Sequence, residues 1–111
     1  MTQLDQITAW LDSHKGQTLQ IEKREQEDLD LTSIRLENVS CRDGIPNRGD
    51  DYIPRRELVL HGSGTILNGE ENPPLPQDQY EIPLAGEWHG SEQGEALRLV
   101  TERATYQITA K

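Results

Sequence analysis

The chain has 111 residues, the size of one domain, so we expect a single domain over residues 1–111. Its formal net charge is −9, and the stretch from His61 to Gln93 holds six acids and no Lys or Arg, which argues against nucleic acid as a partner. Leu, Ile and Val number 13, 8 and 3 and Phe is absent, so the core must be built from branched aliphatic side chains.

An amphipathic helix is predicted over residues 2–15. Apolar residues recur there at helical spacing, namely Leu4, Ile7, Trp10 and Leu11. Thr2 suits the N-cap and Gly16 suits the end of the helix. The polar face lacks the Lys and Arg of a membrane-binding helix, so we expect the helix to pack on the core and expect no membrane partner.

From Gln17 onward the period changes from helical to alternating. Pairs of apolar residues two positions apart mark the first strands: Leu19 with Ile21, Leu29 with Leu31, and Ile34 with Leu36. The parity changes between the second and third pairs. A bulge or bend near Thr32 and Ser33 is therefore predicted, because otherwise one pair would face solvent.

Two later strands carry positional markers. Residues 56–67 form the most apolar strand, and Gly62 and Gly64 within it permit a sharp bend, so we expect a long strand that turns a corner. Residues 80–84 alternate again. Pro83 has no N–H to give to a ladder, which predicts that this strand lies at the edge of a sheet.

A hairpin is predicted at the C-terminus, between residues 95–101 and 104–110. A turn centred on Glu102 and Arg103 sets Leu99 opposite Tyr106. The fold class that follows is α+β: an N-terminal helix and a curved, mainly antiparallel sheet of about five to seven strands, which could close into a small barrel. Two sheets packed as an aligned sandwich are the structural alternative.

Two long connections, residues 40–54 and 68–79, are rich in Gly, Pro, Asn and acids. Loops of this length in a small domain are usually either functional or mobile. Arginines gather around the first loop, interleaved with aspartates. Together with the large rings elsewhere, they give the candidate ligand or partner contacts: Tyr52, Arg55, Arg56, Tyr80, Trp88 and His89.

No catalytic motif is found. His61 and Ser63 stand close together, but a nucleophile elbow must run from a strand into a helix, whereas the chain continues here as strand. Glu87 and His89 could share a metal ion with His61 only if distant strands met. We therefore assign no catalytic residue, metal site or cofactor, and consider an enzyme the less favoured reading.

Three functions remain open. The first is a non-enzymatic interaction or accessory module whose acidic surface meets a basic surface on another protein. The second is a small-ligand-binding, barrel-like protein with Tyr80 and Trp88 near the mouth of its pocket. The third is an acidic mimic of nucleic acid. A lone cysteine, Cys41, and the absence of a leader-like N-terminus predict a cytoplasmic protein. The oligomeric state is left open.

Overall fold

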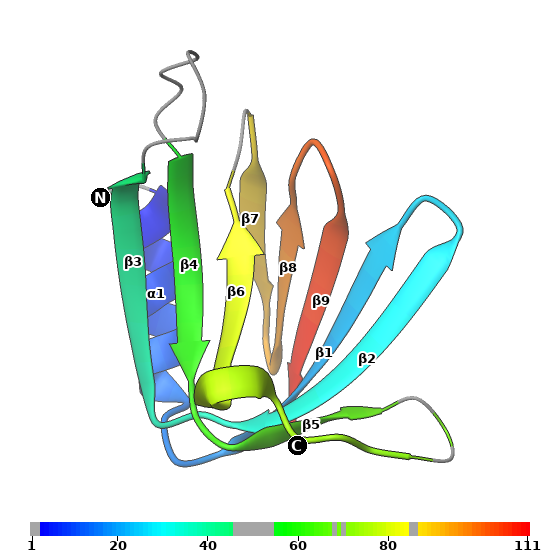
Figure 1. Cartoon of the computed structure of the whole chain (residues 1–111). Coiled ribbons are helices and arrows are strands. Elements are labelled where there is room, and N and C mark those ends of the chain that lie inside the picture. The colour runs from blue at the N-terminus through cyan, green and yellow to red at the C-terminus, as the bar shows by residue number, and fades with distance from the viewer. Residues whose placement is uncertain (1–2, 46–54, 68, 70, 85–86) are drawn as a thin grey trace.

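The computed structural model describes residues 3–45, 55–67, 69, 71–84 and 87–111, with the backbone alone for 43–45 and 55. In this part of the chain one α-helix precedes nine strands (Figure 1). The elements in chain order are α1 (Gln3–Ser13), β1 (Thr18–Glu25), β2 (Asp28–Arg35), β3 (Asn38–Ile45), β4 (Arg55–His61), β5 (Gly64–Leu67), the 3-10 turn η1 (Pro76–Asp78), β6 (Gln79–Pro83), β7 (His89–Gln93), β8 (Ala96–Val100) and β9 (Thr105–Ala110).

The strands of the described residues form two antiparallel sheets. One has six strands in the order β5-β2-β1-β9-β8-β7, and the other has three in the order β3-β4-β6. The α+β class is therefore confirmed, but neither sheet closes on itself there, so the predicted small barrel is not supported. The strand number exceeds the prediction because a corner divides long strands in two, and because β7 carries no apolar alternation in its sequence.

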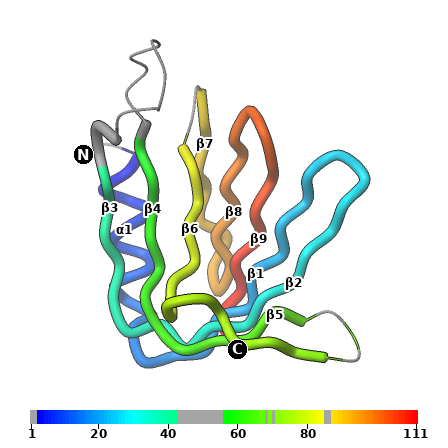
Figure 2. The backbone as a smooth tube through the Cα atoms, viewed as in Figure 1, coloured from blue at the N-terminus to red at the C-terminus, as the bar shows by residue number. Residues whose placement is uncertain are grey.

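The two sheets join at a corner where β2 runs into β3 and β4 runs into β5 (Figure 2). Hydrogen bonds hold these bends together, from Arg35 N to Ser63 O at 2.9 Å and from Glu37 N to His61 O at 2.8 Å. A Cβ at Gly62 would overlap the carbonyl oxygen of Arg35, and a Cβ at Gly64 would overlap a carbonyl oxygen of β2. The predicted corner in residues 56–67 is confirmed, and its glycines permit the close approach of the two backbones.

Of the bulge or bend predicted near Thr32 and Ser33, the bulge is wrong. Strands β1 and β2 pair without a register shift from Thr18 opposite Arg35 to Glu25 opposite Asp28. Thr32 occupies the inward position and is buried, whereas Leu29 points outward and is 50% exposed. Every second residue of β2 therefore points inward without interruption. A threonine takes one of these inward positions, although apolar periodicity alone would assign it to a leucine.

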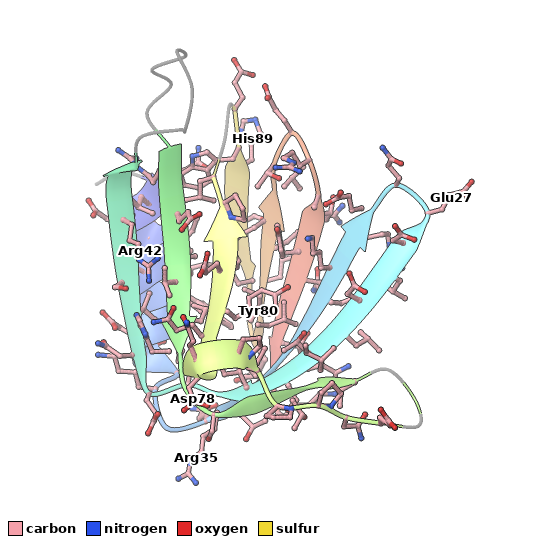
Figure 3. All side chains as sticks on the ribbon, viewed as in Figure 1. Glu27, Arg35, Arg42, Asp78, Tyr80 and His89 are labelled. Carbon is pink, nitrogen blue, oxygen red and sulfur yellow. The ribbon has the colours of Figure 1, made fainter. Side chains whose placement is uncertain are left out.

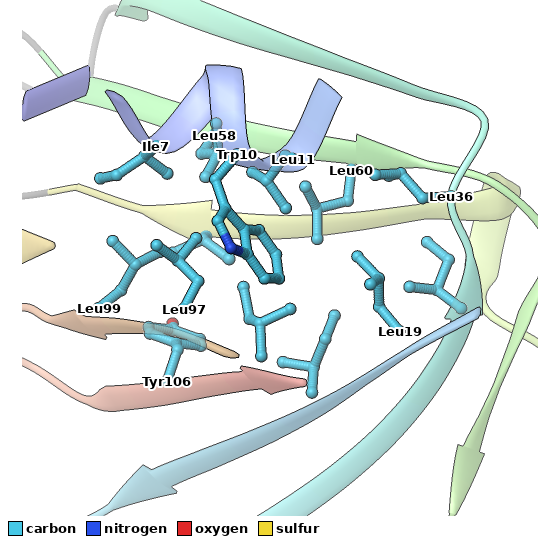
Figure 4. Close-up of a cluster of buried hydrophobic side chains, with 14 of the residues drawn as sticks. Ile7, Trp10, Leu11, Leu19, Leu36, Leu58, Leu60, Leu97, Leu99 and Tyr106 are labelled. Atoms are coloured by element: carbon cyan, nitrogen blue, oxygen red, sulfur yellow. The ribbon is translucent and has the colours of Figure 1, made fainter. Parts of the chain in front are cut away.

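Helix α1 packs against β7 and β3 and covers one end of the space between the sheets. The interior there is filled by side chains from the helix and both sheets (Figure 4), including Ile7, Trp10, Leu11, Leu19, Leu36, Leu58, Leu60, Leu97, Leu99 and Tyr106. The indole Nε1 of Trp10 donates a hydrogen bond to Gly94 O at 3.2 Å. Gly16, at a φ of 86°, follows the helix as predicted, and Thr2 lies outside the described residues.

The register of the C-terminal hairpin is confirmed, with Leu99 opposite Tyr106 and Leu97 opposite Ile108. The Thr101 hydroxyl supports the turn, since it accepts a hydrogen bond from Ala104 N at 3.0 Å. The edge prediction for Pro83 is confirmed as well, because β6 is the last strand of the three-stranded sheet in the described part of the chain. This free edge borders the candidate site.

Candidate functional site

A groove of about 470 Å³ runs beside β6, where the three-stranded sheet faces the inner side of β1, β2 and β5. Four of the residues that line it are apolar or aromatic: Ile66, Leu75, Pro76 and Tyr80. Polar and charged groups complete it: Lys23, Asp30, Thr32, Gln77, Gln79 and Glu81. Apolar side chains can hold a ligand by burial, and polar groups beside them can fix its orientation.

The hollow continues along β6 toward the turn between β8 and β9. A second part of about 170 Å³ is lined by Lys23, Glu25, Pro83, Thr101, Arg103 and Tyr106. Lys23 is part of the lining of both hollows. We call the two together the β6 groove, because residues of β6 line both of them, namely Gln79, Tyr80, Glu81 and Pro83.

Residues 72–76 form one end of the groove because they lie along β5. Ile66 N donates to Pro73 O at 2.8 Å, and Leu75 N donates to Gly64 O at 3.0 Å. Leu75 is buried by this arrangement. The predicted loop 68–79 thus contains a segment held against a strand, followed by η1. Gln77 and Asp78 in η1 have positive φ values of 57° and 52°, a conformation that costs non-glycine residues energy.

Two tyrosines face the groove from opposite sheets. Burial raises the pKa of Tyr80 far above its ordinary value, and the nearby Tyr106 and Asp30 raise that pKa further. Burial and Glu25 also raise the pKa of Tyr106, although Arg103 opposes this shift. Both hydroxyls are therefore protonated at neutral pH and can donate or accept hydrogen bonds.

The charged side chains that line the β6 groove are two basic and three acidic ones. One of the basic side chains, Lys23, already lies close to groups that attract a cation: its Nζ is 3.5 Å from Glu25 Oε1 and 6.0 Å from the centre of the Tyr106 ring. Asp30 and Glu81 are exposed at the groove. A cationic group is thus the complement that the groove accepts best.

The outward face of the three-stranded sheet carries a polar network instead of a groove. Ser40 Oγ and His61 Nε2 share a hydrogen bond of 2.7 Å across β3 and β4. Arg42 donates to Gln79 Oε1 at 3.3 Å, so its side chain crosses β4. Val59 points to this face and is fully buried, which fits coverage by these polar side chains.

The histidine and serine singled out in the sequence do not form a catalytic pair with each other. His61 bonds Ser40 rather than its near neighbour Ser63. Neither Ser40 nor His61 is among the residues that line the β6 groove. A nucleophile and base also need an oxyanion site within about 3 Å of the reacting atom, and this pair lies on the flat face of two paired strands. We read the pair as a cross-strand contact.

The six predicted contact residues do not all meet in one place, and as a binding set they stay a prediction. Tyr80 lines the groove, whereas His89 is exposed on the outward face of β7, far along the molecule from Tyr80 (Figure 3). Trp88 packs half-buried against the core. Arg56 is exposed on β4. Tyr52 and the side chain of Arg55 lie outside the described residues.

Sequence reasoning missed most of the groove. Lys23 and Asp30 are opposite each other on β1 and β2, but pairing of these strands had to be known before the two could be placed together. Leu75 stands among prolines in a segment predicted to be a loop. One signal could have found it: a lone leucine between Pro74 and Pro76 is an apolar residue that needs burial.

Among the described residues, no three His, Cys, Asp or Glu side chains gather closely enough to hold a metal ion. His61 belongs to the three-stranded sheet and His89 to the six-stranded one. No helix of the described chain is long and apolar enough to cross a membrane.

Comparison with known proteins identifies relatives but no activity. A model of the YmzB-like protein family matches residues 1–111. The chain is 45% identical over 109 residues to the uncharacterized protein YmzB of Bacillus subtilis (strain 168), a match that covers 93% of this chain and 91% of the relative. No solved structure matches the chain.

Proposed function

The chain belongs to the YmzB-like family, and we propose that it is a non-enzymatic interaction module that binds a partner protein in the β6 groove. One observation carries the proposal: a groove with apolar and aromatic side chains in its lining runs beside the free edge of a strand. Grooves of this kind suit extended segments of other proteins, which gain affinity from main-chain hydrogen bonds and specificity from side-chain pockets.

The partner surface that fits is basic. The chain carries a net charge of −9, and three of the five charged side chains that line the groove are acidic. Opposite charge on the partner would speed association and disfavour acidic competitors. We place the protein in the cytoplasm, where a lone exposed thiol such as that of Cys41 stays reduced.

Position-dependent photocrosslinking tests the proposal. The photoreactive residue p-benzoylphenylalanine is introduced at Arg103, which lines the groove, and separately at Gln93, which is exposed on β7 outside it. Irradiation in cells of the source organism should give a discrete protein adduct from position 103. An excess of unmodified protein should suppress this adduct, and position 93 should not form it.

Three results would overturn the proposal. Equal adducts from both positions, or none from either, would remove the groove as a protein-binding site. A small mass excess on the natively purified protein in native mass spectrometry, without a protein adduct, would support a small ligand instead. The groove volume of about 470 Å³ is large enough for such a ligand.

A further inference from the structure

The free edge of β6 presents an unequal set of hydrogen-bonding groups. On the paired side, Leu84 N donates to Arg56 O at 2.8 Å and Gly62 N donates to Asp78 O at 2.9 Å. Successive residues of an antiparallel strand point their backbone groups to opposite sides. The N–H and C=O groups of the residues in between, Gln79, Glu81 and Pro83, therefore point away from β4.

Acceptors outnumber donors among these three residues. The N–H of Gln79 already donates to Pro76 O within η1. Pro83 has no N–H. Of these three residues, Glu81 alone thus has a backbone N–H available to donate, whereas all three have a carbonyl oxygen that can accept. The carboxylate of Glu81 adds further acceptors at the same point. A ligand that pairs with this edge must bring more donors than acceptors.

We propose that the groove takes an extended segment of a partner protein that pairs antiparallel with β6 and sets a Lys or Arg side chain beside Glu81. The proposal rests on the proposed function and names its ligand class. The residue opposite Glu81 exchanges two hydrogen bonds with it, and the residues two positions away donate their N–H groups to the carbonyls of Gln79 and Pro83. Side chains in between lie on the face of Tyr80 and Ile82, where apolar groups fit.

A second copy of this chain is a poor occupant of the same edge. Two β6 strands paired about Glu81 would set the two Glu81 carboxylates directly opposite each other, which is destabilising. Gln79 would stand opposite Pro83, and neither would offer a free N–H. The same shortage of donors keeps the edge from pairing with itself.

Defined peptides test this proposal on the full-length protein. The probe is the terminally blocked pentapeptide Thr-Val-Arg-Val-Thr, titrated into the 15N-labelled protein and followed by the amide signals of β6. One matched peptide carries Glu in place of Arg, and another carries an N-methyl group on the central Arg, which removes its backbone donor. Each change should weaken binding by about tenfold, the effect of one lost charge-assisted or main-chain hydrogen bond.

Variants of the chain provide the complementary test. Glu81→Gln should weaken binding of the Arg peptide by about fivefold and should leave binding of the Glu peptide unweakened. Glu37→Gln removes the same charge from an exposed residue at the corner, outside the groove lining, and should change neither affinity. Circular dichroism checks that each variant keeps its fold.

Each possible outcome of these titrations either supports or contradicts the proposed ligand class. Equal affinity of the N-methylated and parent peptides would exclude strand pairing, and equal affinity of the Arg and Glu peptides would exclude the charge preference. Absence of binding by the parent peptide at millimolar concentration, or a dimer that Glu81→Pro dissociates, would overturn the proposal. If photocrosslinking at position 103 still captures a partner in those cases, the interaction module stands and only the ligand class fails.

Discussion

Gly90 of β7 lies directly against Ile7 of helix α1, and a single methyl group there should weaken the docking of the helix. A Cβ at Gly90 would lie 2.5 Å from Ile7 Cδ1, 2.8 Å from Ile7 Cγ1 and 3.2 Å from Leu99 Cδ2. Carbon atoms in contact normally stand about 3.5–4.0 Å apart, so the Ile7 side chain must move by about 1 Å. Overpacking of this kind destabilises the folded state, whereas alanine also makes the unfolded chain stiffer, which offsets part of the loss. Together the two effects should lower the unfolding free energy of Gly90→Ala by about 1–2 kcal/mol.

A double-mutant cycle with Ile7→Val isolates the contact. Ile7 is 2% exposed, and the truncation deletes Cδ1, the atom nearest to the added methyl. Alone, Ile7→Val should cost about 1 kcal/mol. Combined with Gly90→Ala, it removes the shorter of the two overlaps with Ile7, so the pair should be about 1 kcal/mol more stable than the sum of the two losses predicts.

Urea unfolding followed by the fluorescence of Trp10 and Trp88 measures all four proteins, with circular dichroism as a second probe of two-state behaviour. Ile108→Val is the matched control, because Ile108 is also a buried isoleucine, on β9, and none of its atoms is among those nearest to a Cβ at Gly90. Its loss should add to that of Gly90→Ala. Additivity of Ile7→Val within about 0.5 kcal/mol would refute the reasoning, because the helix would then not be limited by this contact.

Three further predictions concern the corner, a turn and the groove. In the same urea assay, Gly64→Ala should lose more unfolding free energy than Gly90→Ala, at least about 3 kcal/mol. The reason is that the new Cβ meets the backbone of β2, which cannot rotate away. A smaller loss than at Gly90 would contradict the close packing of the corner. Gln26→Gly should raise the melting temperature measured by circular dichroism, since Gln26 has a φ of 54° in the β1–β2 turn, and the gain should be about 0.5–1 kcal/mol; an unchanged or lower melting temperature would contradict it. Burial raises the folded-state pKa of Tyr80 above the ordinary value of 10.0, so its contribution to stability is complete below pH 10 and is lost as pH rises beyond it. As the pH rises from about 9 to about 11, the unfolding free energy of Tyr80→Phe should therefore fall by less than that of the wild type. Equal decreases in the two proteins would count against a buried Tyr80 hydroxyl.

Local features of the fold could be read from the sequence wherever a residue type restricts its own backbone. The C-terminal hairpin followed from two alternating runs around a short turn, and the edge position of β6 followed from the missing N–H of Pro83. Gly62 and Gly64 predicted the corner, because residues without a Cβ permit a sharp bend and a close approach of two backbones. Strand β7 could not be found in this way, because neither its composition nor its polarity distinguishes it from a loop.

The groove was decided by long-range pairing. Tyr80 was among the predicted contact residues, but Lys23, Asp30 and Leu75 were not, because they come from three segments that only the folded sheets bring together. The sequence by itself determined the fold class, the corner, the edge strand and the acidic charge, since these depend on local conformational limits and on composition. Only the tertiary structure decided which groups face the edge of β6, because the direction of a side chain or N–H depends on strand register, which the partner strand sets.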